Sequence, residues 1–84
     1  MPVGVGVVKA ENGMVISDVK VEIQETFFKT YSNQEGAFEF SKLEPGNYQL
    51  NLSLIGFKPI SKKIQITGKN LDVTFVMTKY SRLI

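Results

Sequence analysis

The chain has 84 residues, ten of them basic and eight acidic, and it contains neither cysteine nor histidine. This length suits one domain, and a net charge of +2 with dispersed basic residues argues against nucleic acid as a partner. Without thiols or imidazoles the chain lacks disulfides, thiolate metal sites and the commonest general base. We therefore expect no metal, no cofactor and no enzymatic activity.

A valine-rich sequence opens the chain and predicts a first strand over Val3 to Lys9. The residues that it buries are ambiguous, because valines occur at both odd-numbered and even-numbered positions and would therefore point to both faces of the sheet. Gly4 and Gly6 interrupt it, and glycines inside a strand often mark a bulge or a close approach of another group. An Asn-Gly pair ending at Gly13 then predicts a turn. In the segment that follows, we expect Ile16 to close one end of the core.

Alternating residues predict a second strand over Asp18 to Glu25 and a short third strand over Lys29 to Ser32. Phe27 and Phe28 lie between them and are adjacent, so they cannot share one face of a strand. We expect one buried ring and one exposed ring, or two rings on a loop. With Tyr31, they form the first candidate surface, although single exposed apolar residues are ordinary. The residues predicted to face inward are Val19, Val21 and Ile23.

The centre of the chain carries the strongest β signals. A polar turn ending at Gly36 precedes a short aromatic strand, Ala37 to Phe40. Pro45 and Gly46 predict a type II turn in which the glycine takes a positive φ. Tyr48 to Leu54 then alternates cleanly between apolar and polar residues, which is typical of a strand with one buried face. The residues predicted to face inward here are Tyr48, Leu50, Leu52 and Leu54.

The last third of the chain predicts two more strands. Gly56 ends the preceding strand, and Phe57 follows it. Ile60 to Thr67 is the next strand and our candidate sheet edge, because a proline precedes it. Lys62 falls at the same alternate positions as the residues expected to face the core. An inward-pointing lysine near a strand end discourages the pairing of this edge with the sheet edge of another molecule. The final strand is expected over Leu71 to Met77.

About seven short strands with regular turn signals and no helical period predict an all-β protein, a seven-stranded Greek-key β-sandwich. We place the domain at residues 1–78 and a C-terminal tail or linker at 79–84. The sequence shows no signal peptide and no apolar stretch of membrane-spanning length. If the native protein is exported, we expect this chain to be part of a longer one.

Candidate catalytic groups are scattered. The eight carboxylates are dispersed over turns and outward strand positions, and no serine lies in a G-x-S-x-G context. The polar cluster Asn33 to Gly36 only distantly imitates a calcium loop, and a plain turn is the simpler interpretation. These observations favour a non-catalytic domain.

Six short motifs follow one another in a characteristic order. They are Gly6-x-Val8, Asn12-Gly13, Val19-x-Val21, Ser32-Asn33-Gln34-Glu35-Gly36-x-Phe38-x-Phe40, Leu43-x-Pro45-Gly46-x-Tyr48-x-Leu50 and Ile55-Gly56-Phe57. Together they resemble the carboxypeptidase-regulatory-like domain, a transthyretin-like (prealbumin-like) sandwich of seven strands. The resemblance covers Val3 to Met77. The chain departs from it at Asn33, where aspartate is common, and at Asp18, where a glycine or small residue is common.

The resemblance implies several settings. Such domains are accessory domains of metallocarboxypeptidases, N-terminal periplasmic extensions of TonB-dependent outer-membrane receptors, and parts of surface proteins and adhesins. The short length and the L-x-P-G-x-Y spacing look most like the receptor extension. The implied partners are the rest of a larger parent protein and a periplasmic protein, and the implied location is the periplasm or the outer membrane.

Two functional hypotheses remain. In the first, the domain is a structural or protein-interaction module that binds through a sheet edge, for which Ile60 to Thr67 is the candidate. In the second, it binds a glycan on exposed aromatic residues. Burial of both Phe27 and Tyr31 would exclude the second hypothesis, and a single exposed patch containing both would favour it. The candidate surface residues are Phe27, Phe28, Tyr31 and Phe57.

Overall fold

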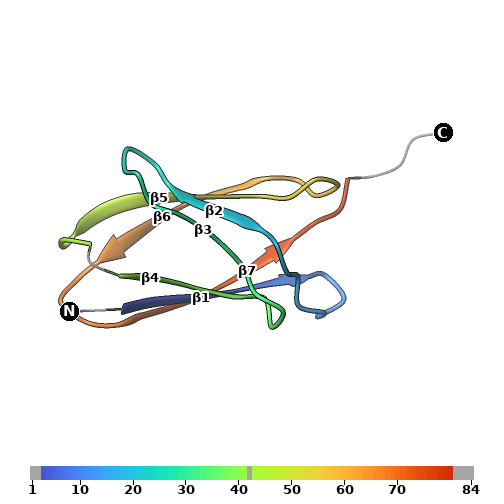
Figure 1. The fold of residues 1–84 in the computed structure, drawn as a ribbon, viewed down its shortest axis with the longest axis horizontal. Helices are drawn as coiled ribbons and strands as arrows, with labels where there is room; N and C mark the ends of the chain where they lie inside the picture. Colours follow the sequence, from blue (N-terminus) through green and yellow to red (C-terminus); the bar gives the residue numbers. More distant parts are fainter. Residues whose placement is uncertain (1–2, 42, 81–84) are drawn as a thin grey trace.

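The described residues of the computed structural model, 3–41 and 43–80, form seven strands and no helix (Figure 1). One sheet has three strands in the order β4-β1-β7, and the other has four in the order β3-β2-β5-β6. The two sheets face each other, so the predicted all-β, transthyretin-like Greek-key sandwich is confirmed. The strands are β1 (Val3–Ala10), β2 (Lys20–Ile23), β3 (Lys29–Tyr31), β4 (Ala37–Ser41), β5 (Gly46–Ser53), β6 (Ile60–Ile66) and β7 (Leu71–Met77).

The glycines of β1 decide which way that strand faces. Gly4, Gly6 and Val8 are buried on the inner face, whereas Val5 and Val7 lie on the outer face and are half-buried. A Cβ atom added to either glycine would overlap a phenylalanine ring of the neighbouring strand β4. The glycines therefore mark a close approach, as the sequence suggested, and the ambiguity of the first strand is resolved in favour of Val8 facing inward.

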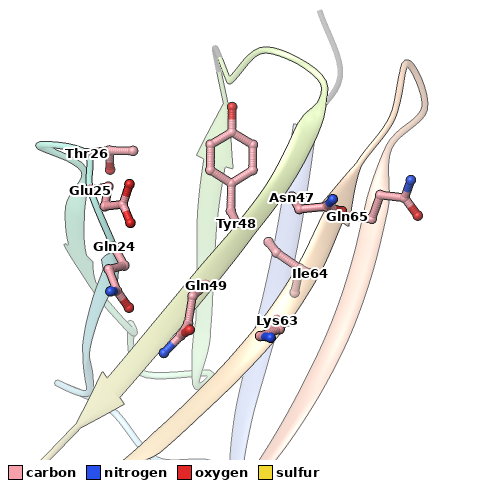
Figure 2. A pocket seen from close by; sticks show the side chains of 9 residues that line it. All are labelled: Gln24, Glu25, Thr26, Asn47, Tyr48, Gln49, Lys63, Ile64 and Gln65. Carbon is pink, nitrogen blue, oxygen red and sulfur yellow. The ribbon is translucent and has the colours of Figure 1, made fainter.

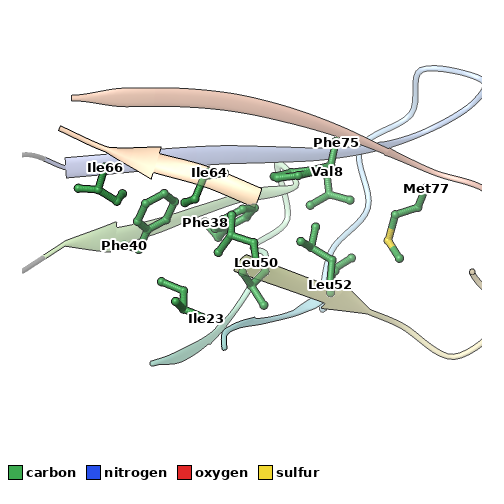
Figure 3. Close-up of a cluster of buried hydrophobic side chains, with 12 residues drawn as sticks. Val8, Ile23, Phe38, Phe40, Leu50, Leu52, Ile64, Ile66, Phe75 and Met77 are labelled. Atoms are coloured by element: carbon green, nitrogen blue, oxygen red, sulfur yellow. The ribbon is translucent and has the colours of Figure 1, made fainter. Parts of the chain in front are cut away.

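The core has two layers of different composition (Figure 3). The three-stranded sheet contributes three phenylalanines, and Phe38 stacks between Phe40 and Phe75 with ring centroids 6.2 and 6.3 Å apart. The four-stranded sheet contributes branched aliphatic residues. Tyr48 and Leu54, predicted to face inward, are only half-buried, because Tyr48 lies near the start of β5 and Leu54 follows its last residue. The aliphatic layer consists of Val21, Ile23, Leu50, Leu52, Ile64 and Ile66.

The second strand is shorter at both ends than the predicted range of residues 18–25. Asp18 takes φ of 64° and Glu25 takes φ of 67°, and these left-handed conformations end the extended backbone on either side of Lys20–Ile23. Asp18 is also the position where the resembling domains commonly carry glycine or a small residue. Its backbone conformation gives the physical reason, because glycine enters this region without steric cost.

The glycines predicted to lie in turns differ in their backbone φ angles. Gly13, Gly36 and Gly56 all take positive φ. Gly46 does not, so the type II turn predicted for Pro45 and Gly46 is wrong. Gly46 is the first residue of β5 and pairs with Ile66 of β6, which requires extended backbone.

The chain stays attached to the sandwich beyond the last strand. The amide of Lys58 donates a hydrogen bond to the Thr78 carbonyl at 2.8 Å, and the amide of Tyr80 donates to the Gly56 carbonyl at 3.1 Å. The first two residues of the expected 79–84 tail thus lie against the loop that precedes β6, and residues 81–84 lie outside the described residues. The boundary after residue 78 stays a prediction.

Candidate functional site

Phe27 and Phe28 point in opposite ways, as their adjacency requires. Phe27 lies in the turn between β2 and β3 and is fully exposed. Phe28 is half-buried and packs edge-on against Phe40, with ring centroids 6.3 Å apart and planes at 78°. One ring therefore supports the core, and the other is available at the surface.

Phe27 and Tyr31 are both exposed but lie at opposite ends of the β2–β3 hairpin. Tyr31 is the last residue of β3 and pairs with Lys20, the first residue of β2, whereas Phe27 lies in the turn beyond Ile23. They do not form the single patch considered above. Because neither ring is buried, the condition that would exclude glycan binding is not met.

Tyr31 instead shares a depression with the loop before β6. This aromatic groove, defined by Tyr31, Ile55, Phe57 and Tyr80, has a volume of about 520 Å³. Ile55 is almost fully exposed, and the Lys79 ammonium lies 6.0 Å from the centre of the Phe57 ring. The groove is completed by Asp18, Lys20, Ser53, Leu54, Gly56 and Pro59.

Sequence reasoning missed Ile55 and Tyr80 as members of this groove. Ile55 breaks the alternation of the preceding strand, and an exposed isoleucine beside a turn glycine was a usable signal. Tyr80 fell in the expected tail, and backbone pairing of residues 78–80 with residues 56–58 brings it beside Phe57. No sequence pattern predicts that pairing.

A second depression, of about 660 Å³, lies at the other end of the four-stranded sheet (Figure 2). We call it the amide depression, defined by Gln24, Asn47, Gln49 and Gln65. In Figure 2, Gln24 comes from the β2–β3 turn, Asn47 and Gln49 from β5, and Gln65 from β6. Its other lining residues are Glu25, Thr26, Tyr48, Lys63 and Ile64.

Strand β6 is an edge of the four-stranded sheet, as predicted for this part of the chain. Its seven residues pair with β5 on one side, and no described strand pairs with them on the other. Lys62 and Lys63 are both exposed. Lys62 therefore reaches solvent although it lies on the same side of the strand as the buried Ile64 and Ile66. Extended side chains of lysine at a sandwich rim commonly do this.

The described residues offer little for catalysis or for metal binding. Within residues 3–41 and 43–80, no three His, Cys, Asp or Glu side chains gather closely enough to hold a metal ion. The ion pair between Lys20 and Glu22, 3.5 Å long, is exposed. Across the same part of the chain, no helix has the length and hydropathy needed to cross a lipid bilayer.

Residues 5–83 match the sequence profile of the CarboxypepD_reg-like domain. The chain belongs to this family. The match covers both depressions and every strand except the first two residues of β1. A search of curated proteins found no match.

Solved structures share the fold of this CarboxypepD_reg-like domain. A chain of a type II cohesin–X-dockerin complex from Acetivibrio cellulolyticus has a TM-score of 0.79 at 16% identity, covering 92% of this chain and 57% of that one. The Bacillus anthracis TIE protein has a TM-score of 0.75 at 19% identity, covering 93% and 16%. The 5-hydroxyisourate hydrolase of Klebsiella pneumoniae has a TM-score of 0.78 at 18% identity, covering 96% and 93%.

These identities show a shared fold and nothing about activity. The domain spans little more than half of the cohesin-complex chain and about one sixth of the TIE protein, so in both it corresponds to a part of a larger molecule. The family and its fold are thus established, and function has to be argued from the surface of the domain.

Proposed function

We propose that this domain is a non-catalytic module of a larger protein and that it binds a partner protein through the free edge of β6. The observation that carries the proposal is the position of β6, which within residues 3–41 and 43–80 pairs only with β5, along Ile60–Ile66. An edge strand of this length offers unpaired N–H and C=O groups on which an extended segment can add as a further strand.

The charge of the edge indicates what kind of segment would fit. Lys62 and Lys63 lie on β6, with Lys58 before the strand and Lys69 after it. Among the described residues, none of these four lysines forms an ion pair. Lysines on an edge disfavour pairing of two copies of the same edge, because like charges would face each other. An acidic extended segment would relieve that repulsion, so we propose an acidic partner strand.

We further propose that the parent protein is a TonB-dependent outer-membrane nutrient receptor and that this domain is its periplasmic N-terminal extension. The L-x-P-G-x-Y spacing at Leu43 to Tyr48 supports this, as does the family assignment. The cohesin–X-dockerin complex, an assembly of protein modules, also carries this fold. Other parents to be tested are a metallocarboxypeptidase, for which the domain would be an accessory, and an adhesive surface protein.

Fractionation of the source cells, followed by blotting with an antibody raised to this domain, tests the parent. We expect a product several times longer than 84 residues in the outer-membrane fraction. A small soluble product, or one that co-purifies with zinc-peptidase activity, would overturn the receptor assignment. The proposal for the β6 edge would then be tested in that other parent.

Charge reversal tests the edge itself. The double variant Lys62→Glu/Lys63→Glu should abolish association with the native partner, because an acidic strand would meet two carboxylates. Lys29→Glu reverses a charge on β3, the opposite edge of the same sheet, and should leave association intact. Association measured by co-purification from the source cells that is equally sensitive to both changes would contradict a role for β6.

A further inference from the structure

We propose that the amide depression and the adjacent Phe27 bind an uncharged polyhydroxylated ligand, namely a segment of a neutral sugar chain. This goes beyond the proposed role of the β6 edge. The site lies on the outer face of the four-stranded sheet, and its central residues come from β5 and the β2–β3 turn (Figure 2).

The amide groups of the depression are unsatisfied within the molecule. The side chains of Gln24, Asn47 and Gln65 make no hydrogen bond to any described residue. Gln49 donates only a long bond of 3.5 Å to Asn51. Each amide carries two N–H donors and a carbonyl acceptor, and a sugar hydroxyl both donates and accepts. Several amides around one depression therefore match a ligand that presents several hydroxyls.

The residues of β5 are an unusual choice for a central strand. Its outward positions hold only uncharged polar residues, and asparagine, which is depleted from strands, occurs twice among them. A strand that needed only solubility would carry threonine or charged residues at lower conformational cost. The Asn51 side-chain oxygen accepts a hydrogen bond from the Ser61 hydroxyl at 2.6 Å, so Asn47 and Gln49 are the β5 amides left for a ligand. The outward residues are Asn47, Gln49, Asn51 and Ser53.

The charge of the depression points to a neutral ligand. Among the described residues, Glu25 and Lys63 are the only charged ones that line it, and they have opposite signs. They form no ion pair with each other within the described residues, so both remain available at its rim. An anionic or cationic ligand would gain one attraction and meet one repulsion, whereas an uncharged ligand can accept hydrogen bonds from Lys63 and donate them to Glu25.

Phe27 supplies the apolar contact that a sugar ring also requires. It directly follows Thr26, which lines the depression, and its side chain is fully exposed. The flat face of an aromatic ring packs well against an apolar surface while the polar groups of the ligand remain hydrogen-bonded elsewhere. Phe27 does not line the depression itself, but it is the next residue after Thr26 and its exposed ring is available to a ligand that extends beyond the amides.

The polar face continues along β5 to the aromatic groove. Asn47 lies in the amide depression and Ser53 lines the aromatic groove, six residues further on. At roughly 3.3 Å per residue this separation is about 20 Å. An extended chain of several sugar units could lie along β5, and we expect affinity to rise with chain length.

NMR titration of the 15N-labelled chain with cellohexaose, maltohexaose and mannohexaose tests the proposal. We expect at least one of them to bind with Kd at or below about 1 mM and to shift the amide signals of the β2–β3 turn and of Asn47, Gln49 and Gln65. Asn47→Val and Phe27→Ala should each weaken binding by about fivefold to tenfold. The spectrum of each variant also reports whether it is folded.

Thr74→Val is the matched control, because it replaces a polar residue by valine on the outer face of the other sheet and should bind as the original chain does. The proposal is overturned if none of the three hexaoses binds, if shifts gather elsewhere, or if Asn47→Val binds unchanged. None of the test variants lies on β6, so failure here leaves the proposed edge interaction untouched.

Discussion

The two sheets contribute different kinds of side chain to one core. The three-stranded sheet presents stacked phenylalanine rings, and its central strand opposes them with glycines at residues 4 and 6. The buried residues of the four-stranded sheet are branched aliphatic side chains, two of which come from β5, and the half-buried Tyr48 packs against them near the start of that strand. Phe38 and Phe40 pair with Gly6 and Gly4 and fill the space that these glycines leave, whereas Phe75 pairs with Val8, which keeps its side chain.

The comparison also separates two roles. The three-stranded sheet stabilises the fold, because its phenylalanine rings are buried and pack directly against the backbone of Gly4 and Gly6. The outer face of the aliphatic sheet carries both depressions and the free edge of β6. We therefore expect changes in the first sheet to act on stability and changes on the outer face of the second to act on binding.

Phe38→Ala is expected to have the largest effect. Phe38 contacts both Phe40 and Phe75, so its removal leaves a cavity bordered by two rings and should lower the free energy of unfolding by about 3–5 kcal/mol. Urea denaturation gives the value. Phe27→Ala, at the exposed ring, should change it by less than about 0.5 kcal/mol. Similar losses for the two variants would contradict the assigned core.

Gly6→Ala should come next. The added methyl group would overlap the Phe38 ring, and overpacking of this kind costs about 2–3 kcal/mol. Gly46→Ala is the control within another strand, because its nearest neighbour atom would be Tyr48 Cε2 at an ordinary 3.8 Å. A further change of Phe38→Leu should restore part of the stability lost by Gly6→Ala. An unchanged or deeper loss in the double variant would show that the ring is not what the glycine accommodates.

Ser32→Ala removes the side-chain hydrogen bonds between the β3–β4 connection and the β1–β2 connection, each of which runs from one sheet to the other. Buried Ser32 lies between β3 and β4, and its hydroxyl accepts a hydrogen bond from the Val19 amide at 2.9 Å and donates one to the Ile16 carbonyl at 2.8 Å. Its loss leaves a buried donor unpaired and should cost about 1–2 kcal/mol. Thermal unfolding measures the effect, with the exposed Ser53→Ala as control. Equal midpoints for the two variants would be inconsistent with this role.

Glu25→Gly should have the smallest effect, and in the stabilising direction. Glycine relieves the left-handed backbone at residue 25 but adds freedom to the unfolded chain, which leaves a net gain of about 0.5 kcal/mol. Glu25→Ala should show no such gain, because alanine is strained in the same conformation. A destabilising Glu25→Gly measured by urea denaturation would mean that the glutamate side chain stabilises the turn.

Much of the fold is readable from the sequence because period-2 alternation is strong where one face is buried. Val21 and Ile23 of β2, and Leu50 and Leu52 of β5, are buried as predicted. The exceptions have local causes. The ends of β2 depend on φ angles at residues 18 and 25 that no residue preference dictates, and Gly46 has the sequence of a turn but is held extended by its pairing with β6.

The surface was harder to predict because it depends on pairing between distant segments. Tyr31, Phe57 and Tyr80 meet only after the β3 end, the loop before β6 and the C-terminal segment are placed together. The four amides of the amide depression likewise come from three separate elements. Their outward facing was predictable from parity, but their gathering around one depression was not.

Hydrogen exchange offers the most direct test of the central claim that β6 is the binding edge. Amide protection would be compared between the isolated 84-residue chain and the native full-length protein purified with its partners. The N–H groups of β6 that point away from β5 should exchange freely in the isolated chain and become protected in the native assembly. Unchanged exchange along Ile60–Ile66, with protection gained at β3 or nowhere, would contradict the account.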